Sequence, residues 1–342
     1  MKFVVGFTST GIGCVILLWL LSSCSVADAS DVLTLIYSGE EQGQLGLHGC
    51  GAEQVGGLSR RQTVIQSLRE KHSNILNLHT GNILSPTDPN VELIYQIALE
   101  AMEEMNYDVF FLGPQDLCLP VDSLQALYAN HPNLSVVCTN LFSPNTSLFP
   151  PYILQNTPSQ IKVALVGLIS KSHETEFTAY NSGITLTSPE EALDALEGEI
   201  AEKSDVVVGV LHGSEAEARG LAERIPWLDV LILARNESAD TPSPAIIRSA
   251  AIVTNPPKGE AVGVLEVGLD ANLSVVSSQG YRVEVSNKLC PTRTLKPYWH
   301  CTIASLKMAD SEAMTMYQMT ELSISPTFTN VGVKSAPEPA RF

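Results

Sequence analysis

The stretch Gly56-Gly57-Leu58-Ser59-Arg60-Arg61 decides the fold expected for this chain, because it joins a glycine-containing loop to the first helical pattern. The pattern runs over Ser59–Lys71 and places Val64, Ile65 and Leu68 on one face, as in a helix that packs on a core. We therefore expect the chain to enter its first helix directly after this glycine pair.

Short runs rich in β-branched residues alternate with helical patterns along the chain, and they predict buried strands. The predicted strands are Val32–Tyr37, Ile75–Leu78, Val109–Leu112, Ser135–Thr139, Lys162–Leu168, Asp205–Leu211, Val230–Leu233, Ala251–Thr254, Gly263–Leu269 and Tyr281–Val285. Further helices are predicted over Val91–Asn106 and Ser214–Arg224. This alternation predicts an α/β sandwich.

Ser188-Pro189-Glu190-Glu191 predicts a helix start. Ser188 caps, Pro189 takes the first helical position, and Glu191 closes a capping box. We expect this helix to run to about Lys203. The β-rich run that closes the domain, without helices, predicts a second sheet packed on the first.

The order of these segments resembles the calcineurin-like metallophosphoesterases of the 5′-nucleotidase branch, over roughly residues 31–285. The hexapeptide at Gly56 is very close to the Gly-Gly-Leu-Ala-Arg-Arg that opens the first helix in that branch. Gly43, Gly81, Gly113 and Asn140 also match the family pattern. The resemblance implies a four-layer α/β/β/α sandwich and a centre of two metal ions that activate a bridging water.

The first two metal-binding motifs of the family are altered in this chain. The family's Asp-x-His becomes Glu40 and Gln42, within Gly39-Glu40-Glu41-Gln42-Gly43. The family's Gly-Asp, whose Asp bridges both metals, becomes Gly81-Asn82. A neutral amide in place of the bridging carboxylate removes a negative charge that both metal ions share.

The later motifs are altered as well, with one exception. Gly-Asn-His-Glu becomes Gly113-Pro114-Gln115-Asp116, so Gln115 stands at the position of the catalytic His. His212 keeps the fourth motif. The fifth motif, Gly-His-x-His, becomes Ala234-Arg235-Asn236-Glu237, which puts a cation where a metal ion would lie.

These losses predict a catalytically degenerate protein that acts by binding or as an envelope accessory protein, with no cofactor. The alternative is an active phosphoester hydrolase with an altered site of one divalent metal (Mn, Zn or Fe) held by Glu40, Asn82, His212 and Glu237. A structural interpretation also stands. His212 is then a hydrogen-bonded residue, the acids Glu40, Glu41 and Glu237 are solvated, and Arg235 pairs with Glu40 or Glu237. His79, directly after the second strand, is a further candidate for lining the old pocket.

A third functional alternative is a thiol redox accessory centred on Cys50, with His48 as its partner. The competing interpretation is a structural cysteine or half of a disulfide. Cys290 and Cys301, eleven residues apart, are expected to form a disulfide in an exported protein. Cys118 and Cys138 are either buried thiols or a second bridge.

Residues 1–24 are predicted to be a signal peptide with a lipobox. Lys2 precedes an apolar core of about ten residues, too short to span a bilayer, and Leu21-Ser22-Ser23-Cys24 follows it. Cys24 would be the acylated N-terminus of an exported lipoprotein on the periplasmic or outer-membrane side of a bacterial envelope. The alternative is an ordinary cut after Ala29. Residues 286–324 form an extension with the Cys pair, and 325–342 a poorly ordered tail.

The charge of the chain restricts its partners. The formal net charge is −17, and removal of residues 1–23 takes away Lys2 and no acid. A strongly acidic chain repels nucleic acid, so we exclude nucleic-acid binding. The expected partners are a membrane, through the lipid anchor, and an envelope protein.

Overall fold

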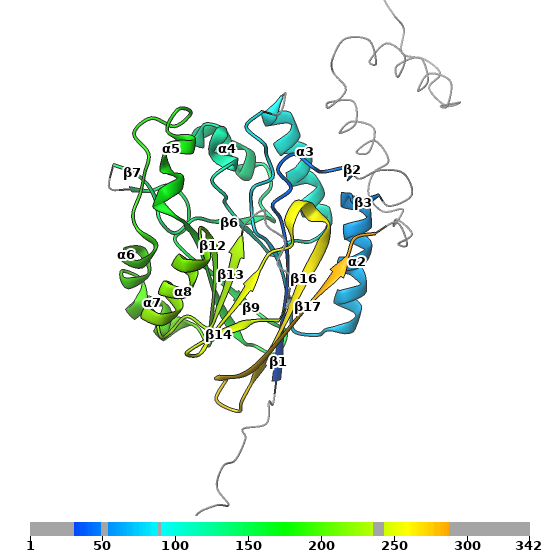
Figure 1. The fold of residues 1–342 in the computed structure, drawn as a ribbon, viewed down its shortest axis with the longest axis vertical. Helices are drawn as coiled ribbons and strands as arrows, with labels where there is room; N and C mark the ends of the chain where they lie inside the picture. The colour runs from blue at the N-terminus through cyan, green and yellow to red at the C-terminus, as the bar shows by residue number, and fades with distance from the viewer. Residues whose placement is uncertain (1–30, 49–53, 88–89, 145, 235–242, 287–342) are drawn as a thin grey trace, which may run out of the picture.

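The computed structural model describes residues 31–48, 54–87, 90–144, 146–234 and 243–286, and within them two six-stranded sheets pack face to face (Figure 1). The first sheet has the order β17-β16-β1-β4-β5-β6. Its parallel strands are β1 (Asp31–Ser38), β4 (Ile75–His79), β5 (Val109–Phe111) and β6 (Ser135–Val137). Strand β16 (Ala261–Leu269) pairs antiparallel with β1, and β17 (Val275–Glu284) forms the edge.

The second sheet has the order β14-β15-β13-β12-β10-β9. Its parallel strands are β10 (Lys162–Ile169), β12 (Val206–His212), β13 (Val230–Ala234) and β15 (Ala250–Thr254). The antiparallel edges are β9 (Ile153–Asn156) and β14 (Ala245–Ile247). The prediction that the closing β-rich run forms the second sheet is wrong. That run divides, because β15 completes the second sheet while β16 and β17 return to the first.

Smaller elements complete the described chain. The short strands are β2 (Leu47–His48), β3 (Val55–Gly56), β7 (Leu141–Ser143), β8 (Thr146–Ser147) and β11 (Thr185–Leu186). The short helices are α5 (Glu174–Phe177) and the 3₁₀ turns Asp116–Cys118, Lys171–His173 and Pro257–Gly259.

The longer helices cover the outer faces of the two sheets (Figure 1). They are α2 (Leu58–Lys71), α3 (Val91–Glu104) and α4 (Val121–Ala129) on the first sheet, and α6 (Pro189–Asp194), α7 (Glu197–Lys203) and α8 (Glu215–Arg224) on the second. None of the described helices has the length and apolar character needed to cross a membrane.

Three apolar cores separate the four layers. One lies between the first sheet and its helices and contains Val64 and Phe110. The second lies between the two sheets and contains Leu35 and Val208, and the third lies under α8 and contains Leu221. Burial of apolar side chains on both faces of each sheet explains why the parallel strands read as continuous hydrophobic runs. The four-layer α/β/β/α sandwich is confirmed.

The helix predicted from Ser188 to Lys203 is two helices. Its start is confirmed, because the Ser188 side chain accepts from the Glu191 N–H at 3.2 Å and Glu191 accepts from the Ser188 N–H at 3.1 Å. The Leu196 N–H then donates to the Leu193 carbonyl, three residues back, so the α-helical pattern stops before α7 begins. Helix α4 was not predicted.

Candidate functional site

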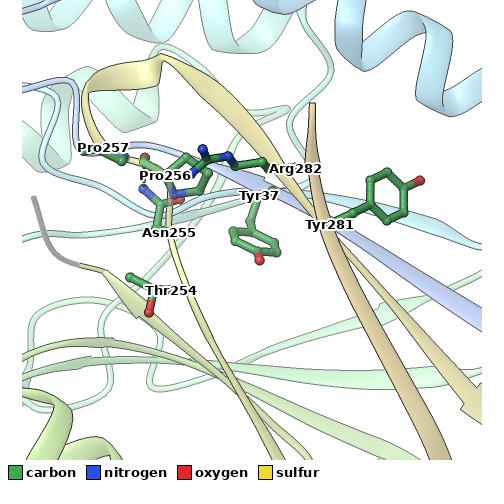
Figure 2. A pocket seen from close by; sticks show the side chains of 8 residues that line it. Tyr37, Thr254, Asn255, Pro256, Pro257, Tyr281 and Arg282 are labelled. Atoms are coloured by element: carbon green, nitrogen blue, oxygen red, sulfur yellow. Dashed lines mark hydrogen bonds between the residues drawn. The ribbon is translucent and has the colours of Figure 1, made fainter. Parts of the chain in front are cut away.

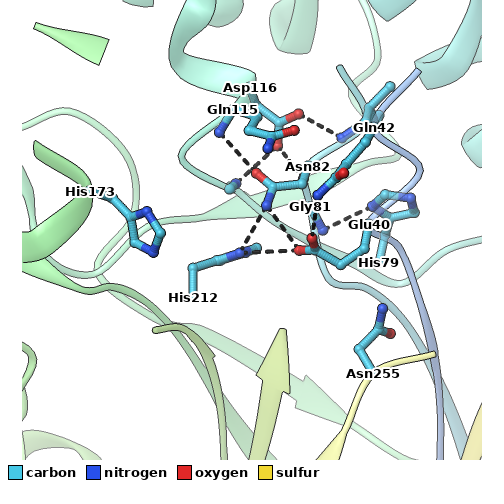
Figure 3. A network of polar contacts seen from close by, with 12 residues as sticks. Glu40, Gln42, His79, Gly81, Asn82, Gln115, Asp116, His173, His212 and Asn255 are labelled. Atoms are coloured by element: carbon cyan, nitrogen blue, oxygen red, sulfur yellow. Dashed lines mark hydrogen bonds and ion pairs between the residues drawn. The ribbon is translucent and has the colours of Figure 1, made fainter. Parts of the chain in front are cut away.

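The motif residues meet at the C-terminal ends of the parallel strands, where loops from both sheets converge (Figure 3). Glu40 follows β1, Asn82 follows β4, and Gln115 follows β5. His212 ends β12 in the other sheet, and its Nδ1 lies 3.3 Å from Oε1 of Glu40. This contact joins the two sheets at the position where the family resemblance places a metal centre.

The first two loops run side by side in a strained conformation. The N–H groups of Glu40, Gln42 and Gly43 donate to the carbonyls of Gly81, Asn82 and Ile83, at 2.7–2.9 Å. Glu40, Gln42 and Asn82 each have a positive φ, between 46° and 58°. Such a backbone costs about 1 kcal/mol or more at each non-glycine residue. The fold therefore holds these three side chains in a conformation that local preference alone would not select.

The close approach of the loops also requires glycine at two positions. A Cβ on Gly81, whose φ is +87°, would meet the Phe111 carbonyl oxygen at 2.3 Å. A Cβ on Gly113 would meet Oδ1 of Asn82 at 2.2 Å. The motif glycines are thus explained by packing at this site.

The orientation of the Asn82 amide is fixed by its neighbours. The backbone N–H of Gln115 donates to Oδ1 of Asn82 at 2.9 Å, so the oxygen points toward that loop. The amide nitrogen, Nδ2, therefore faces the other side, where it donates to Oε1 of Glu40 at 3.0 Å and lies 3.4 Å from Nδ1 of His212. Where the resemblance places the bridging carboxylate, the chain therefore presents an N–H group, which has no lone pair for a metal ion.

Glu40 and His212 are the ionisable residues of this cluster, and both are buried. Glu40 accepts from Asn82 and, at 3.4 Å, from Gln42, and its Oε1 lies 3.3 Å from Nδ1 of His212. Nε2 of His212 is buried without a hydrogen-bond partner among the described residues. The interpretation of His212 as a hydrogen-bonded residue is confirmed, and the prediction that Glu40 and Glu41 are solvated loop acids is wrong.

Asp116 holds the loops in place from behind. Its carboxylate accepts from the backbone N–H groups of Asn82, Ile83 and Gly113 at 2.8–2.9 Å. Burial raises the pKa of Asp116 to about 6, although these N–H groups lower it. Asp116 therefore positions the Asn82 and Gln115 loops.

A second polar cluster, defined by Glu41, Arg61 and His79, lies beside the first. Arg61 donates from Nη1 to Oε1 of Glu41, and Nε2 of His79 lies 3.2 Å from the same oxygen. The Gly81 N–H donates to Nδ1 of His79, so the proton of the ring is on Nε2 and is donated to Glu41. Burial raises the pKa of Glu41, but His79 and Arg61 together bring it down to about 2. His79 stacks on Phe110 with ring centroids 4.5 Å apart.

This cluster explains the Arg-Arg pair of the opening hexapeptide. Arg61 is 1% exposed and runs from α2 to the loop after β1, whereas Arg60 is half-buried and donates to the Gln54 carbonyl. A Cβ on Gly259 would meet Nη2 of Arg61 at 1.9 Å, so the chain also leaves room for this guanidinium. The sequence analysis did not predict this cluster, although it named His79 as a candidate for lining the pocket and Arg61 as part of the opening hexapeptide.

Asn255, after β15, lies beside the site and was also missed. Its Nδ2 donates to the Pro256 carbonyl at 2.8 Å, while its Oδ1 is buried without a partner among the described residues. Figure 2 shows Asn255 in a small hollow with Tyr37, Pro256 and Arg282. The hollow has a volume of about 20 Å³, which is room for roughly one water molecule. Burial raises the pKa of the Tyr37 phenol above its ordinary range.

The described residues do not fit a two-metal centre. Such a centre needs carboxylate and imidazole lone pairs that converge on each ion. Asn82 presents an N–H, Pro114 has no donor atom, and Glu40 and His212 already pair with each other. Across the described part of the chain, no three His, Cys, Asp or Glu side chains are grouped so as to hold a metal ion.

Several predictions of site residues fall outside the described residues. These are Cys24, Cys50, Arg235, Glu237, and the Cys290–Cys301 disulfide. They stay predictions. His48 lies within the described part, and its Nε2 contacts Glu260 at 3.1 Å. Cys118 and Cys138 are both buried and no disulfide joins them, so the alternative of a second bridge between them is wrong, and burial raises the pKa of Cys138 to about 12.

Comparison with known proteins supports the same fold. No family model matches the chain. A snake venom 5′-nucleotidase from Crotalus adamanteus is 24% identical over 230 residues, which are 63% of this chain and 38% of that protein. A second, from Gloydius brevicauda, is 27% identical over 45% of this chain and 28% of that protein. The chain thus spans about a third of the length of these relatives.

Solved structures align over most of the chain. A 5′-nucleotidase precursor from Thermus thermophilus has a TM-score of 0.67 at 18% identity, covering 86% of this chain and 60% of that one. The calcineurin-like phosphoesterase YfkN from Bacillus subtilis has a TM-score of 0.63 at 16% identity, covering 85% and 98%. The chain therefore has the fold of the calcineurin-like phosphoesterases, and the resemblance to their 5′-nucleotidase branch is confirmed.

Proposed function

We propose that this protein is a non-hydrolysing relative of the 5′-nucleotidases, exported and anchored through a lipid on Cys24, that acts by binding as an accessory protein of a bacterial envelope. The orientation of the Asn82 amide carries this proposal. Its oxygen is held by the Gln115 N–H and its nitrogen by Glu40, so the residue cannot bridge two cations without breaking both contacts.

The charge of the site argues against a phosphate substrate without metal. The acids Glu40, Glu41 and Asp116 are buried here, and Arg61 is the buried guanidinium beside them. A phosphate dianion would meet carboxylates at short range in a medium of low dielectric. Metal ions offset that repulsion in a phosphoesterase, and the described residues do not fit them.

A binding role is supported by strain and by unsatisfied polar atoms at the same edge of the sheets. Oγ1 of Thr80, Oε1 of Gln115, Nε2 of His212 and Oδ1 of Asn255 are buried without partners among the described residues. Such atoms and the positive φ angles at Glu40, Gln42 and Asn82 are costly, and features of this kind concentrate at functional sites. The amide oxygens of Gln115 and Asn255 can only accept hydrogen bonds, so a group bound to them would be a donor such as an amine or a hydroxyl.

The test is hydrolysis of AMP and of bis-p-nitrophenyl phosphate by the purified protein with manganese, zinc or iron added. We expect the rate to match that of a His212→Ala variant under every metal. A metal-dependent rate that His212→Ala abolishes would instead establish the single-metal hydrolase built on Glu40 and His212. The redox alternative at Cys50 predicts alkylation faster than that of a peptide cysteine near pH 7.

A further inference from the structure

We propose that Asn272 is an acceptor for N-linked glycosylation in the compartment to which the chain is exported, and that Asn133, which begins the same tripeptide, is not. The proposal rests on the export in the proposed function. It is carried by two copies of one acceptor sequence that lie in different surroundings in the fold.

The tripeptide Asn-Leu-Ser occurs twice among the described residues, at Asn133-Leu134-Ser135 and at Asn272-Leu273-Ser274. Asparagine followed by any residue except proline and then by serine or threonine is the acceptor sequence for N-linked glycans in exported proteins, and it has to lie in a surface loop. Because the two copies are identical, a difference between them must come from the flanking residues and from the fold.

Asn272 lies in the turn that joins β16 to β17 (Figure 1). The Leu273 N–H donates to the Asp270 carbonyl at 3.0 Å, and the Asp270 N–H donates to the Ser274 carbonyl at 2.9 Å. Leu273 has a φ of 62° and packs against the core between the two sheets. A turn followed by a left-handed residue is a common short hairpin connection. It partly buries Leu273 and leaves Asn272 and Ser274, on either side of it, exposed.

Asp270 stands two residues before Asn272 and holds the turn. Oδ1 of its carboxylate accepts from the backbone N–H groups of Asn272 at 2.8 Å and of Ser274 at 3.0 Å. These bonds use Oδ1 and leave Oδ2 for a partner. Bacterial oligosaccharyltransferases bind an acid at this position, in addition to the hydroxyl two residues after the asparagine. The turn therefore presents the acid, the amide and the hydroxyl together.

The second copy is held differently. Nδ2 of Asn133 donates to Oε1 of Glu103 at 2.6 Å, and Oε2 of the same carboxylate lies 2.9 Å from Nδ1 of His131. Leu134 is buried, and Ser135 begins β6, which pairs with β5. The residue two positions before Asn133 is His131, which is not an acid. Transfer of a glycan to Asn133 would require its amide to leave Glu103 and β6 to open.

The donor in this reaction is an oligosaccharide on a polyprenyl diphosphate. Nδ2 of Asn272 attacks C1 of the first sugar, and the bond between C1 and the diphosphate oxygen breaks. The electron pair of that bond leaves with the lipid diphosphate, while Nδ2 loses one proton to a carboxylate of the transferase. The product is a neutral N-glycosyl amide, and the step needs no oxidant or reductant.

The turn of Asn272 lies at the end of β16 away from the candidate site. The Lys258 N–H, before β16, donates to the Glu40 carbonyl at 2.9 Å. Strand β16 then runs antiparallel to β1, so that Leu269 lies opposite Asp31. At about 3.3 Å per residue, this strand separates the turn from the site by roughly 30 Å. A glycan on Asn272 therefore leaves the candidate site open to its partner.

The test expresses the full chain, with its own residues 1–30, in a Gram-negative host that carries a bacterial oligosaccharyltransferase and its lipid-linked oligosaccharide. Mass spectrometry of peptides from the membrane and periplasmic fractions locates the glycan, and the same host without the transferase is the control. We expect the peptide of Asn272 to carry the mass of one oligosaccharide and the peptide of Asn133 to be unmodified. Asn272→Gln should remove the modification.

Asp270→Asn separates the charge from the turn, because an amide oxygen can still accept the two N–H bonds. We expect this variant to lower the occupancy at Asn272 several-fold. Unchanged occupancy would overturn recognition of the acid.

The location of the protein separates this inference from the proposed function. An exported protein that is unmodified at Asn272, or that is modified equally at Asn133, overturns the inference and leaves the proposed function standing. A protein that stays in the cytoplasm contradicts the export in the proposed function. An established export signal in place of residues 1–30 then tests Asn272 by itself, and an unmodified Asn272 in that exported protein again overturns the inference.

Discussion

Glu40 and Glu41 are adjacent in the sequence and both are buried, yet they belong to two clusters with different electrostatic compensation. Glu41 contacts the guanidinium of Arg61 and the ring of His79. Glu40 contacts two neutral amides and His212. The loop after β1 therefore keeps a strong internal ion pair on the side of Arg61, while the side that faces His212 is held by amide hydrogen bonds.

The largest expected effect comes from removing the cation of the Glu41 cluster. Arg61→Met leaves the Glu41 carboxylate buried beside His79 alone, and an uncompensated buried charge costs about 3–5 kcal/mol. Urea unfolding should show this loss. Arg60→Met, which removes a half-buried neighbour bound to a carbonyl, should cost about 1 kcal/mol.

If Arg61→Met does not fold, Arg61→Lys provides the measurement, because it keeps the charge and loses the planar guanidinium. It should lie between the wild type and the Met variant in unfolding free energy. If Arg60→Met and Arg61→Met lose the same free energy of unfolding, the ion pair of Arg61 with Glu41 does not stabilise the fold as proposed.

The next largest effect is a pH dependence of the free energy of unfolding that arises from the Glu41 carboxylate. Its folded pKa is about 2, below the ordinary value of 4.5. Its contribution is therefore fully present above about pH 4.5 and is lost as the pH falls toward 2, with a total of about 3 kcal/mol. The free energy of unfolding, measured by urea titration across this window, should show a slope that Glu41→Gln removes. The same slope in the Gln variant would assign the acid sensitivity to other carboxylates.

A smaller effect is expected at the Glu40 cluster. Asn82→Asp replaces the amide donor to Glu40 by a second carboxylate and should destabilise the metal-free protein by about 2 kcal/mol, the usual worth of a hydrogen bond to a charged group. The exchange Glu40→Gln with Asn82→Asp keeps one acid and one amide, so it should recover most of that loss. Thermal unfolding with and without manganese measures both variants.

Added manganese should distinguish Asn82→Asp from the wild type. It should raise the Tm of Asn82→Asp, which regains a carboxylate at the bridging position, and leave the wild type unchanged. A wild-type protein stabilised by manganese as much as the variant would contradict the argument from the Asn82 amide.

Sequence patterns predicted the scaffold well, because strands that are buried on both faces need continuous apolar runs, and such runs, for example Lys162–Leu168, are visible in the sequence. The site was predicted in part. The motif glycines and the motif positions of Glu40, Asn82, Gln115 and His212 predicted where the candidate site lies in the fold. Their hydrogen bonds depend on the direction of an amide, which no spacing pattern encodes.

The Glu41 cluster shows why the rest was out of reach. Glu41, Arg61 and His79 come from three different segments, and their pairing depends on how α2 packs against β1 and β4. A lone acid in a loop is usually solvated, so local sequence favoured exposure for Glu41. In the structure, packing of α2 against the loop after β1 buries Glu41 instead.

The measurement that tests the account most directly is the metal content of the purified mature protein after incubation with manganese, zinc and iron. Because the Asn82 amide points its nitrogen at Glu40 and His212, the account predicts close to zero metal per chain by elemental analysis, with no change when chelator is added. One or two metal ions per chain, lost on Asn82→Ala and His212→Ala but retained on Arg60→Met, would contradict it.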